Sequence, residues 1–115
     1  MTDFIEVATA TETREAAVAL AEHLVGTRLA GSAQITGPVT SVFWHLGQQG
    51  TGEEWRLVLL TTADRYPELE ATLLARHPWD NPQVTATSIV VGAASYLRWL
   101  SESIADRPAG PTPSV

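Results

Sequence analysis

The sequence predicts one α+β domain with the element order β-α-β-β-α-β, followed by a further helix. Runs of β-branched and aromatic residues alternate with stretches in which leucine and alanine recur at helical spacing. Clusters of glycine and proline separate several of these segments. The chain has 115 residues, which is near the commonest domain size. That length provides one hydrophobic core and leaves no room for two domains.

The first strand and the first helix occupy the N-terminal quarter of the chain. Residues 4–9, FIEVAT, form a β-branched run typical of a strand. The pattern Thr9-x-x-Glu12 predicts a capping box, in which two side chains satisfy free amides at a helix start. Gly26 predicts the end of that helix. Its buried face is narrow and contains Ala17, Leu20, Ala21 and Leu24.

A long hairpin is predicted next. Its first strand runs from Leu29 to His45, and Gly37 with Pro38 predicts a bulge or bend within it. Residues 46–53, LGQQGTGE, contain three glycines and predict the hairpin loop. Residues 55–62, WRLVLLTT, predict the return strand.

The second half repeats the helix–strand pattern and adds a helix. Asp64 and Pro67 predict a helix start, and the helix runs to about Arg76. Residues 84–92, VTATSIVVG, predict a strand, and a last helix extends from residue 94 to about 105. This order is the ferredoxin-like split β-α-β arrangement, with four antiparallel strands backed by helices. We expect the domain to cover residues 1–106 and residues 107–115, rich in proline and glycine, to form a disordered tail.

Composition excludes several classes of function. The formal net charge is -6, and all seven basic residues are arginines. We therefore expect no binding to nucleic acid or to an anionic membrane, since both require clustered cations. With no cysteine the chain cannot form a disulfide or a thiolate metal site. No N-terminal signal segment and no apolar run long enough to span a bilayer is present, which predicts a cytoplasmic protein.

Motifs for catalysis are also missing. No serine lies in a G-x-S-x-G motif, and without lysine the usual phosphate-binding loop cannot form. The sequence therefore predicts a protein that is not an enzyme.

Three histidines are the candidate metal ligands, and no two of them are close in sequence. His77 lies in the turn ARHPWDNPQV, residues 75–84, where Pro78 and Pro82 restrict the backbone. Such a rigid turn suits a ligand site, but it equally suits a structural corner in which the imidazole bonds to the backbone; the second interpretation is favoured. His45 is expected near the hairpin end, in a solvated or interface position or as a ligand.

Several segments together resemble the CutA family of divalent-cation tolerance proteins. They are RLAGSAQI, VTSVFWHLG, LLTTADRYPELEATLLARHPWDNPQV and YLRWL, and the match covers roughly residues 4 to 105. The resemblance implies a very stable cytoplasmic homotrimer of ferredoxin-like subunits, in which long hairpin strands pair with neighbouring sheets. Trp44 and Trp55 are then candidates for the trimer interface, since aromatic residues supply much of the buried area there. Alternatively, they cover the sheet of their own subunit.

The resemblance also implies a role in divalent metal tolerance, with copper or zinc as the ion. Relatives often have cysteine at the position of Ser32 and lysine at that of Leu60. Without a thiolate, imidazole and carboxylate are the strong ligands that remain, so His77, His45 and Asp80 are the candidates.

A second hypothesis is a sensor for a small anionic ligand. CutA trimers look like PII signalling proteins, which bind nucleotides in clefts between subunits. Arg28 and Arg56 have guanidinium groups suited to phosphate or carboxylate, and Ser32 is a further candidate contact. The alternative for each arginine is a surface ion pair. A structural trimer without a ligand is the third hypothesis.

Overall fold

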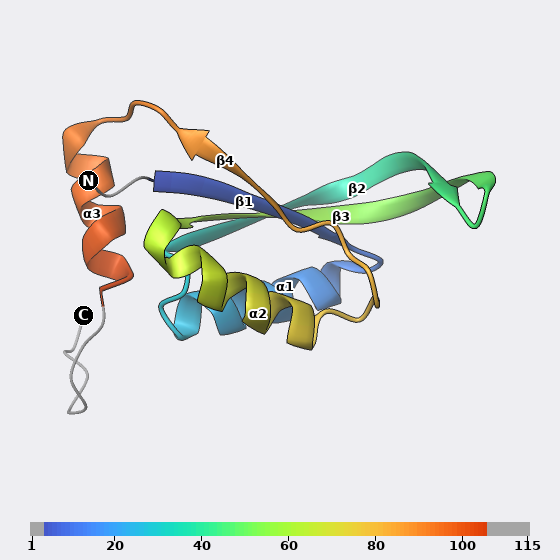
Figure 1. Cartoon of the computed structure of the whole chain (residues 1–115), viewed down its shortest axis with the longest axis horizontal. Coiled ribbons are helices and arrows are strands. Elements are labelled where there is room, and N and C mark those ends of the chain that lie inside the picture. Colours follow the sequence, from blue (N-terminus) through green and yellow to red (C-terminus); the bar gives the residue numbers. More distant parts are fainter. Residues whose placement is uncertain (1–3, 106–115) are drawn as a thin grey trace.

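The computed structural model describes residues 4–105, and they form one four-stranded antiparallel sheet with helices (Figure 1). The strand order is β2-β3-β1-β4, so the predicted ferredoxin-like arrangement is confirmed. The predicted tail lies outside the described residues. The elements are β1 (Phe4–Thr11), α1 (Arg14–Gly26), β2 (Ser32–His45), β3 (Gln48–Thr62), a 3-10 turn (Ala63–Arg65), α2 (Tyr66–Arg76), β4 (Thr85–Ile89) and α3 (Ala94–Ser103).

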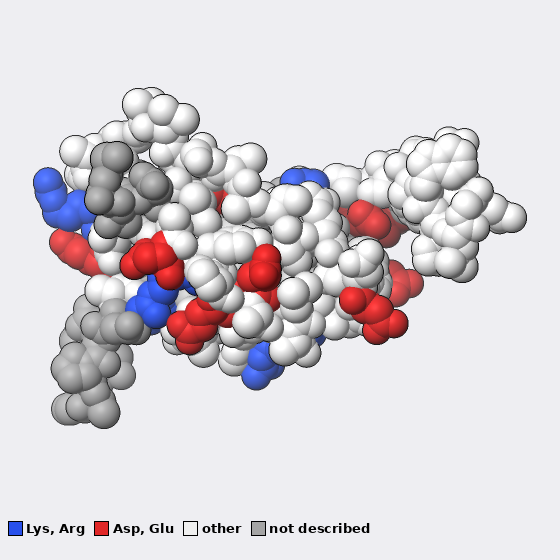
Figure 2. All heavy atoms as spheres, in the orientation of Figure 1, with Lys and Arg blue, Asp and Glu red and all other residues white. Residues whose placement is uncertain are grey.

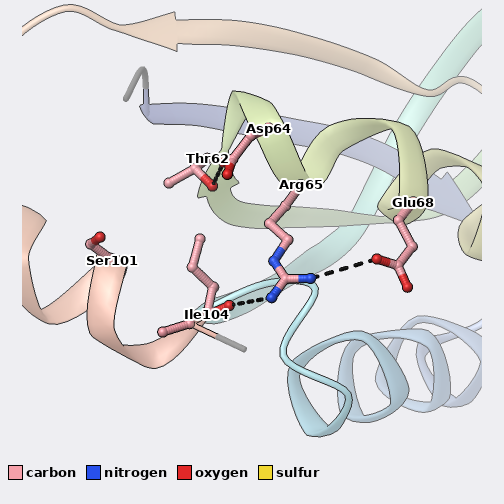
Figure 3. Close-up of a pocket in the computed structure, with 7 residues that line it drawn as sticks. Thr62, Asp64, Arg65, Glu68, Ser101 and Ile104 are labelled. Atoms are coloured by element: carbon pink, nitrogen blue, oxygen red, sulfur yellow. Dashed lines mark hydrogen bonds and ion pairs between the residues drawn. The ribbon is translucent and has the colours of Figure 1, made fainter. Parts of the chain in front are cut away.

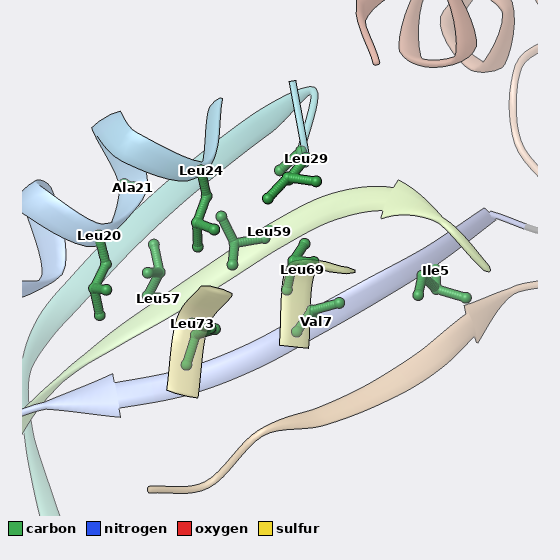
Figure 4. Close-up of a cluster of buried hydrophobic side chains, with 11 residues drawn as sticks. Ile5, Val7, Leu20, Ala21, Leu24, Leu29, Leu57, Leu59, Leu69 and Leu73 are labelled. Atoms are coloured by element: carbon green, nitrogen blue, oxygen red, sulfur yellow. The ribbon is translucent and has the colours of Figure 1, made fainter. Parts of the chain in front are cut away.

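The hydrophobic core lies between one face of the sheet and helices α1 and α2 (Figures 1 and 4). Val7 of β1 lies opposite Leu59 of β3, so both side chains point to the same face. Helix α1 adds Leu20 and Leu24, while α2 adds Leu69 and Leu73. Leucine dominates this core because it fills the space between helix and sheet without a polar atom.

The first helix starts later than the sequence predicted. Strand β1 pairs with β3 as far as Thr11, so Thr9 lies inside the strand and the capping box at Thr9 and Glu12 is wrong. The N-cap is Thr13, whose hydroxyl accepts a hydrogen bond of 3.1 Å from the amide of Ala16. Continued strand pairing therefore outweighs the local capping pattern.

Thr9, which is a strand residue and not the N-cap, is fully buried, and its hydroxyl has no hydrogen-bond partner among the described residues. We expect Thr9→Val to raise the free energy of unfolding by about 1 kcal/mol, because valine keeps the shape and removes an unsatisfied polar atom. Thr61→Val is the matched control: this threonine is equally buried, but its hydroxyl donates to the carbonyl of Leu29 at 2.7 Å. Urea titration of both variants measures the difference, and a loss of stability in Thr9→Val would contradict the expectation.

The hairpin loop is shorter than predicted, because residues 48–53 belong to β3. Only Leu46 and Gly47 connect the strands, with φ of 52° and 78°, as a two-residue type I′ turn requires. Gly50 lies opposite Phe43, whose ring would be 2.7 Å from a Cβ at residue 50. This glycine is therefore required by the packing of an aromatic ring and not by a loop.

The predicted irregularity in β2 is confirmed, since the register of β2 against β3 shifts between Thr36 and Val39. The Gly37–Pro38 peptide bond in this stretch is cis. Strand β2 begins at Ser32 and not at Leu29, because Leu29 and Ala30 form a buried connection after α1. Strand β4 ends at Ile89, three residues before the predicted end.

Helix α3 packs near the ends of the sheet strands and contributes Leu100 to the buried residues, followed by Ile104. Two arginines hold its C-terminal end. Arg28 donates to the carbonyl of Ser103 at 2.8 Å, and Arg65 donates to the carbonyl of Ile104 at 2.9 Å. Cations stabilise a helix C-terminus, where carbonyl groups are left unpaired. None of the helices within residues 4–105 is long and apolar enough to cross a membrane.

Candidate functional site

The turn after α2 places His77 in the interior. The side chain is 8% exposed, and its Nε2 lies 2.8 Å from the carbonyl oxygen of Ala10 on β1. The amide of Trp79 donates to Nδ1 at 3.0 Å. Nδ1 therefore acts as an acceptor and Nε2 as a donor, which assigns one neutral tautomer and uses both ring nitrogens. This is the geometry of a structural corner, with neither nitrogen left for a metal ion.

The tryptophan of this corner packs beside the imidazole. The ring centroids of His77 and Trp79 are 5.3 Å apart with a tilt of 47°, and the indole is half-buried. Asp80 is exposed on the outer side of the turn. The corner thus ties α2 to β1 and leaves one carboxylate facing solvent.

The remaining metal candidate, His45, is exposed at the last position of β2. Figure 1 shows the hairpin end projecting well beyond the helices. Within residues 4–105 of one chain, no three His, Asp or Glu side chains gather in a group that could hold a metal ion. The fold of a single chain therefore does not bring His77, His45 and Asp80 into such a group.

Ser32 and Leu60 are direct cross-strand partners on β2 and β3. The amide of Gly31, next to Ser32, donates to the carbonyl of Leu60 at 2.8 Å. Two of the positions at which the sequence departs from the CutA pattern are therefore neighbours in the sheet.

The two candidate arginines lie in different places. Arg56 is half-buried on β3, with Ala10 and Thr36 as its neighbours in the adjacent strands. Arg28 lies in the connection after α1, with a left-handed φ of 63°. Arg56 lines neither of the two cavities that lie beside α3. The fold does not combine the two guanidinium groups in one site of a single chain.

The first cavity beside α3 has a volume of about 360 Å³ and mostly polar walls (Figure 3). Arg65 crosses it, with an ion pair of 3.5 Å to Glu68 in addition to its bond to Ile104. The hydroxyl of Thr62 donates to Asp64. The lining residues are Thr62, Asp64, Arg65, Glu68, Ser101, Ile104 and Ala105.

The second cavity lies between the end of α1 and α3 and has a volume of about 480 Å³. Its walls combine two opposite charges with an aromatic ring and small apolar groups. Of the residues that line it, the sequence predicts only Arg28 as a candidate for a ligand site. The spacing of Tyr96 and Trp99, one turn apart on α3, was the available signal for the aromatic wall. The lining residues are Val25, Gly26, Arg28, Ala30, Gly31, Trp99, Glu102 and Ser103.

One ionisable group has a pKa shifted by its surroundings. The hydroxyl of Tyr66 donates to Glu70 at 2.7 Å, one turn along α2. That hydrogen bond, then burial, then the negative charge of Glu70 raise the pKa of Tyr66 above its ordinary value of 10.0. The phenol stays neutral and strengthens the start of α2.

Besides the two cavities, the hairpin presents a surface that is a candidate for binding another protein chain. From residue 29 to residue 52 the chain contains no Asp, Glu, Lys or Arg, and Figure 2 shows this end free of charged side chains. Trp44 is 78% exposed, and Val42 and Leu46 are exposed as well. Trp55 differs, since its ring lies against Gly37 of its own hairpin. Trp44 thus projects from the chain, while Trp55 packs against its own hairpin.

Comparison with known proteins identifies the family. Residues 5–103 match the model of the CutA1 divalent ion tolerance protein family. The chain belongs to this family. A CutA relative from Thermus thermophilus is 34% identical over 89 residues, which cover 77% of this chain and 86% of the relative. The chloroplastic CutA 1 of rice is 32% identical over 90 residues, covering 78% of this chain and 51% of the relative.

Solved CutA structures share the fold. The divalent cation tolerance protein of Thermus thermophilus superimposes with a TM-score of 0.85 at 30% identity, covering 91% of this chain and 100% of that one. CutA1 of rice gives a TM-score of 0.87 at 30% identity, with 91% and 96% covered. A structure from Archaeoglobus fulgidus, described as a periplasmic CutA, is 26% identical with a TM-score of 0.83, covering 91% and 100%. The CutA architecture thus accounts for nearly all the described residues.

Proposed function

We propose that this protein is a non-catalytic homotrimer of the cytoplasm that takes part in divalent-cation tolerance, with copper or zinc as the ion. Membership of the CutA family supports the role in tolerance. The observation that supports assembly is the uncharged hairpin, whose apolar side chains project from a single chain into solvent. An exposed apolar surface of this kind marks an interaction site.

The sheet offers a matching surface for a second copy. Strands β2 and β4 are its two edges, and edges with free backbone groups invite pairing with another chain. The segment after β4 exposes Val90 and Val91, which are also uncharged. A hairpin that pairs with the β4 edge of the next subunit would bury both apolar surfaces. Such a head-to-tail contact forms a ring when its rotation closes, and the number three follows from the resemblance to CutA trimers.

Removing the most prominent aromatic group of the hairpin tests this assembly. Trp44→Ser is expected to raise the dissociation constant of the trimer at least about tenfold, because a tryptophan at an interface centre contributes heavily to binding. Gln49→Ser changes the polar residue directly opposite Trp44 and serves as the control. Light scattering across a dilution series gives the mass of each variant. A monomeric wild-type chain would overturn the trimer.

The proposed metal site takes ligands from more than one chain. Within residues 4–105 of one chain no suitable group forms, and both ring nitrogens of His77 are engaged. We therefore assign the imidazole ligand to His45, which is exposed on the hairpin that projects beyond the helices and would meet a neighbouring chain in the proposed trimer. Asp80, exposed on the turn after α2, is the candidate carboxylate. Imidazole and carboxylate together suit zinc and copper(II).

Calorimetric titration of the metal-free protein with copper(II) and zinc(II) tests this site. We expect binding at a fixed ratio per trimer and its loss in His45→Ala. His23→Gln, on helix α1, is the control and should bind as the wild type does. An intact trimer that binds neither ion would contradict the metal role.

The cytoplasmic location of the protein can be tested independently of its metal binding. Relatives bear names that place them in the periplasm or the chloroplast. Fractionation of the source cells, with the protein followed by antibody, is expected to find it in the cytoplasmic fraction; recovery from another compartment would refute this location.

The alternative function, binding of a small anionic ligand or nucleotide between subunits, is favoured by one observation. Arg56 is half-buried, and its guanidinium group has no hydrogen-bond or ion-pair partner within residues 4–105. Ser32 lies on the neighbouring strand β2. A nucleotide that raises the melting temperature of the wild type, but not of Arg56→Gln, would support this function. If the protein binds neither a metal ion nor an anionic ligand, the remaining hypothesis is a structural trimer without a ligand.

A further inference from the structure

The cavity between the end of α1 and helix α3 contains none of the proposed metal ligands and none of the residues of the proposed hairpin contact. Its walls come from three separate segments. Val25 and Gly26 end α1, Arg28 to Gly31 form the connection to β2, and Trp99 to Ser103 belong to α3. Leu100 and Ile104 anchor α3 beside Gly31, where an added Cβ would collide with Leu100. The close approach at Gly31 therefore fixes the distance between the two sides of the cavity.

Arg28 presents a guanidinium group whose bonding capacity is only partly used. Its Nη1 donates to the carbonyl of Ser103 at 2.8 Å, and no other partner exists within residues 4–105. A guanidinium group has five N–H donors in a planar fork. The donors that remain suit a carboxylate, which they can bind in a bidentate geometry.

Glu102 lines the same cavity and provides the opposite charge. Its carboxylate is exposed, and no ion pair joins it to Arg28. Two opposite charges that line one cavity from different segments, without a direct contact, leave space for a ligand that carries both signs. A single anion would meet repulsion from Glu102, and a single cation would meet repulsion from Arg28.

Apart from Ser103, the other side chains of the lining are apolar. Trp99 is 45% exposed, and Val25 with Ala30 adds aliphatic surface. An indole face can cover an aliphatic or aromatic group of a ligand. A volume of about 480 Å³ is within the range of small-molecule sites.

We propose that this cavity binds a small zwitterion of the α-amino-acid class with an apolar side chain. Arg28 binds the carboxylate, Glu102 binds the ammonium group, and Trp99 covers the side chain. The proposal is independent of the metal role, because none of these three residues belongs to the proposed metal ligands.

Titration calorimetry of the full, metal-free chain with L-phenylalanine tests the proposal. We expect saturable binding, with the dissociation constant raised at least about tenfold in Glu102→Gln, which keeps the shape and removes the charge. Glu15→Gln changes an exposed carboxylate on the first turn of α1 and should leave binding unchanged. Arg28→Gln should also weaken binding, with Arg14→Gln as its control. Because Arg28 helps hold α3, Glu102→Gln is the decisive variant.

Two analogues of L-phenylalanine distinguish binding of a zwitterion from binding of a ligand with a single charge. N-acetyl-L-phenylalanine lacks the ammonium group and phenethylamine lacks the carboxylate, so each should bind at least about tenfold more weakly than L-phenylalanine. The change in tryptophan emission on binding should vanish in Trp99→Phe and persist in Trp79→Phe. Equal binding of either analogue, unchanged affinity in Glu102→Gln, or no binding of L-phenylalanine to the folded protein would each overturn the proposal.

Discussion

Replacing Leu73 with alanine is expected to lower the free energy of unfolding by about 2–5 kcal/mol. Leu73 is fully buried on α2, where it packs against the leucines of β3 and α1 (Figure 4). Alanine would remove apolar surface from the core and leave a cavity that the rigid sheet cannot fill. A loss of this size is a large fraction of the stability of a domain of about 100 residues.

The adjacent residue on the same helix is the control. Leu74 is 46% exposed, so Leu74→Ala is expected to cost less than about 1 kcal/mol. Denaturant unfolding of both variants at one fixed protein concentration gives the comparison, since assembly makes stability depend on concentration. Equal losses of unfolding free energy in the two variants would contradict the burial of Leu73 in the core.

Patterns of hydrophobic spacing were sufficient to predict the order of the elements. The face of α1 with Ala17, Leu20, Ala21 and Leu24 is buried as its spacing predicts. The predicted hairpin loop, residues 46–53, is too long because two of its three glycines lie in strand β3 and do not mark a loop. Gly50 has a different physical cause, the Phe43 ring on the opposite strand. A contact across a hairpin depends on register, which the sequence of one strand does not specify.

The candidate site was predictable only in part. The prolines around His77 predict a rigid corner, but the partner of the imidazole, the Ala10 carbonyl, is 67 residues away in sequence. The cavity at Arg28 was even harder to predict from the sequence. It exists because α3 docks beside Gly31, and Glu102 lines the same cavity as Arg28 only as a result of that docking. Long-range packing of this kind leaves no periodic signal in the sequence.

Replacing His77 with alanine is expected to lower the free energy of unfolding by about 2–4 kcal/mol, because the buried Ala10 carbonyl and Trp79 amide each lose a partner and a cavity forms. The same change should leave the affinity for copper(II) and zinc(II) within about twofold of the wild type, a ratio that corresponds to less than about 1 kcal/mol. Denaturant unfolding and calorimetry on the folded variant measure the two quantities separately. If His77 instead served as a ligand, metal affinity would fall sharply, and the hydrogen bonds to β1 and Trp79 would have to break whenever metal binds. A stability loss without an affinity loss would establish that the corner holds α2 against β1 and would leave His45 as the imidazole to examine.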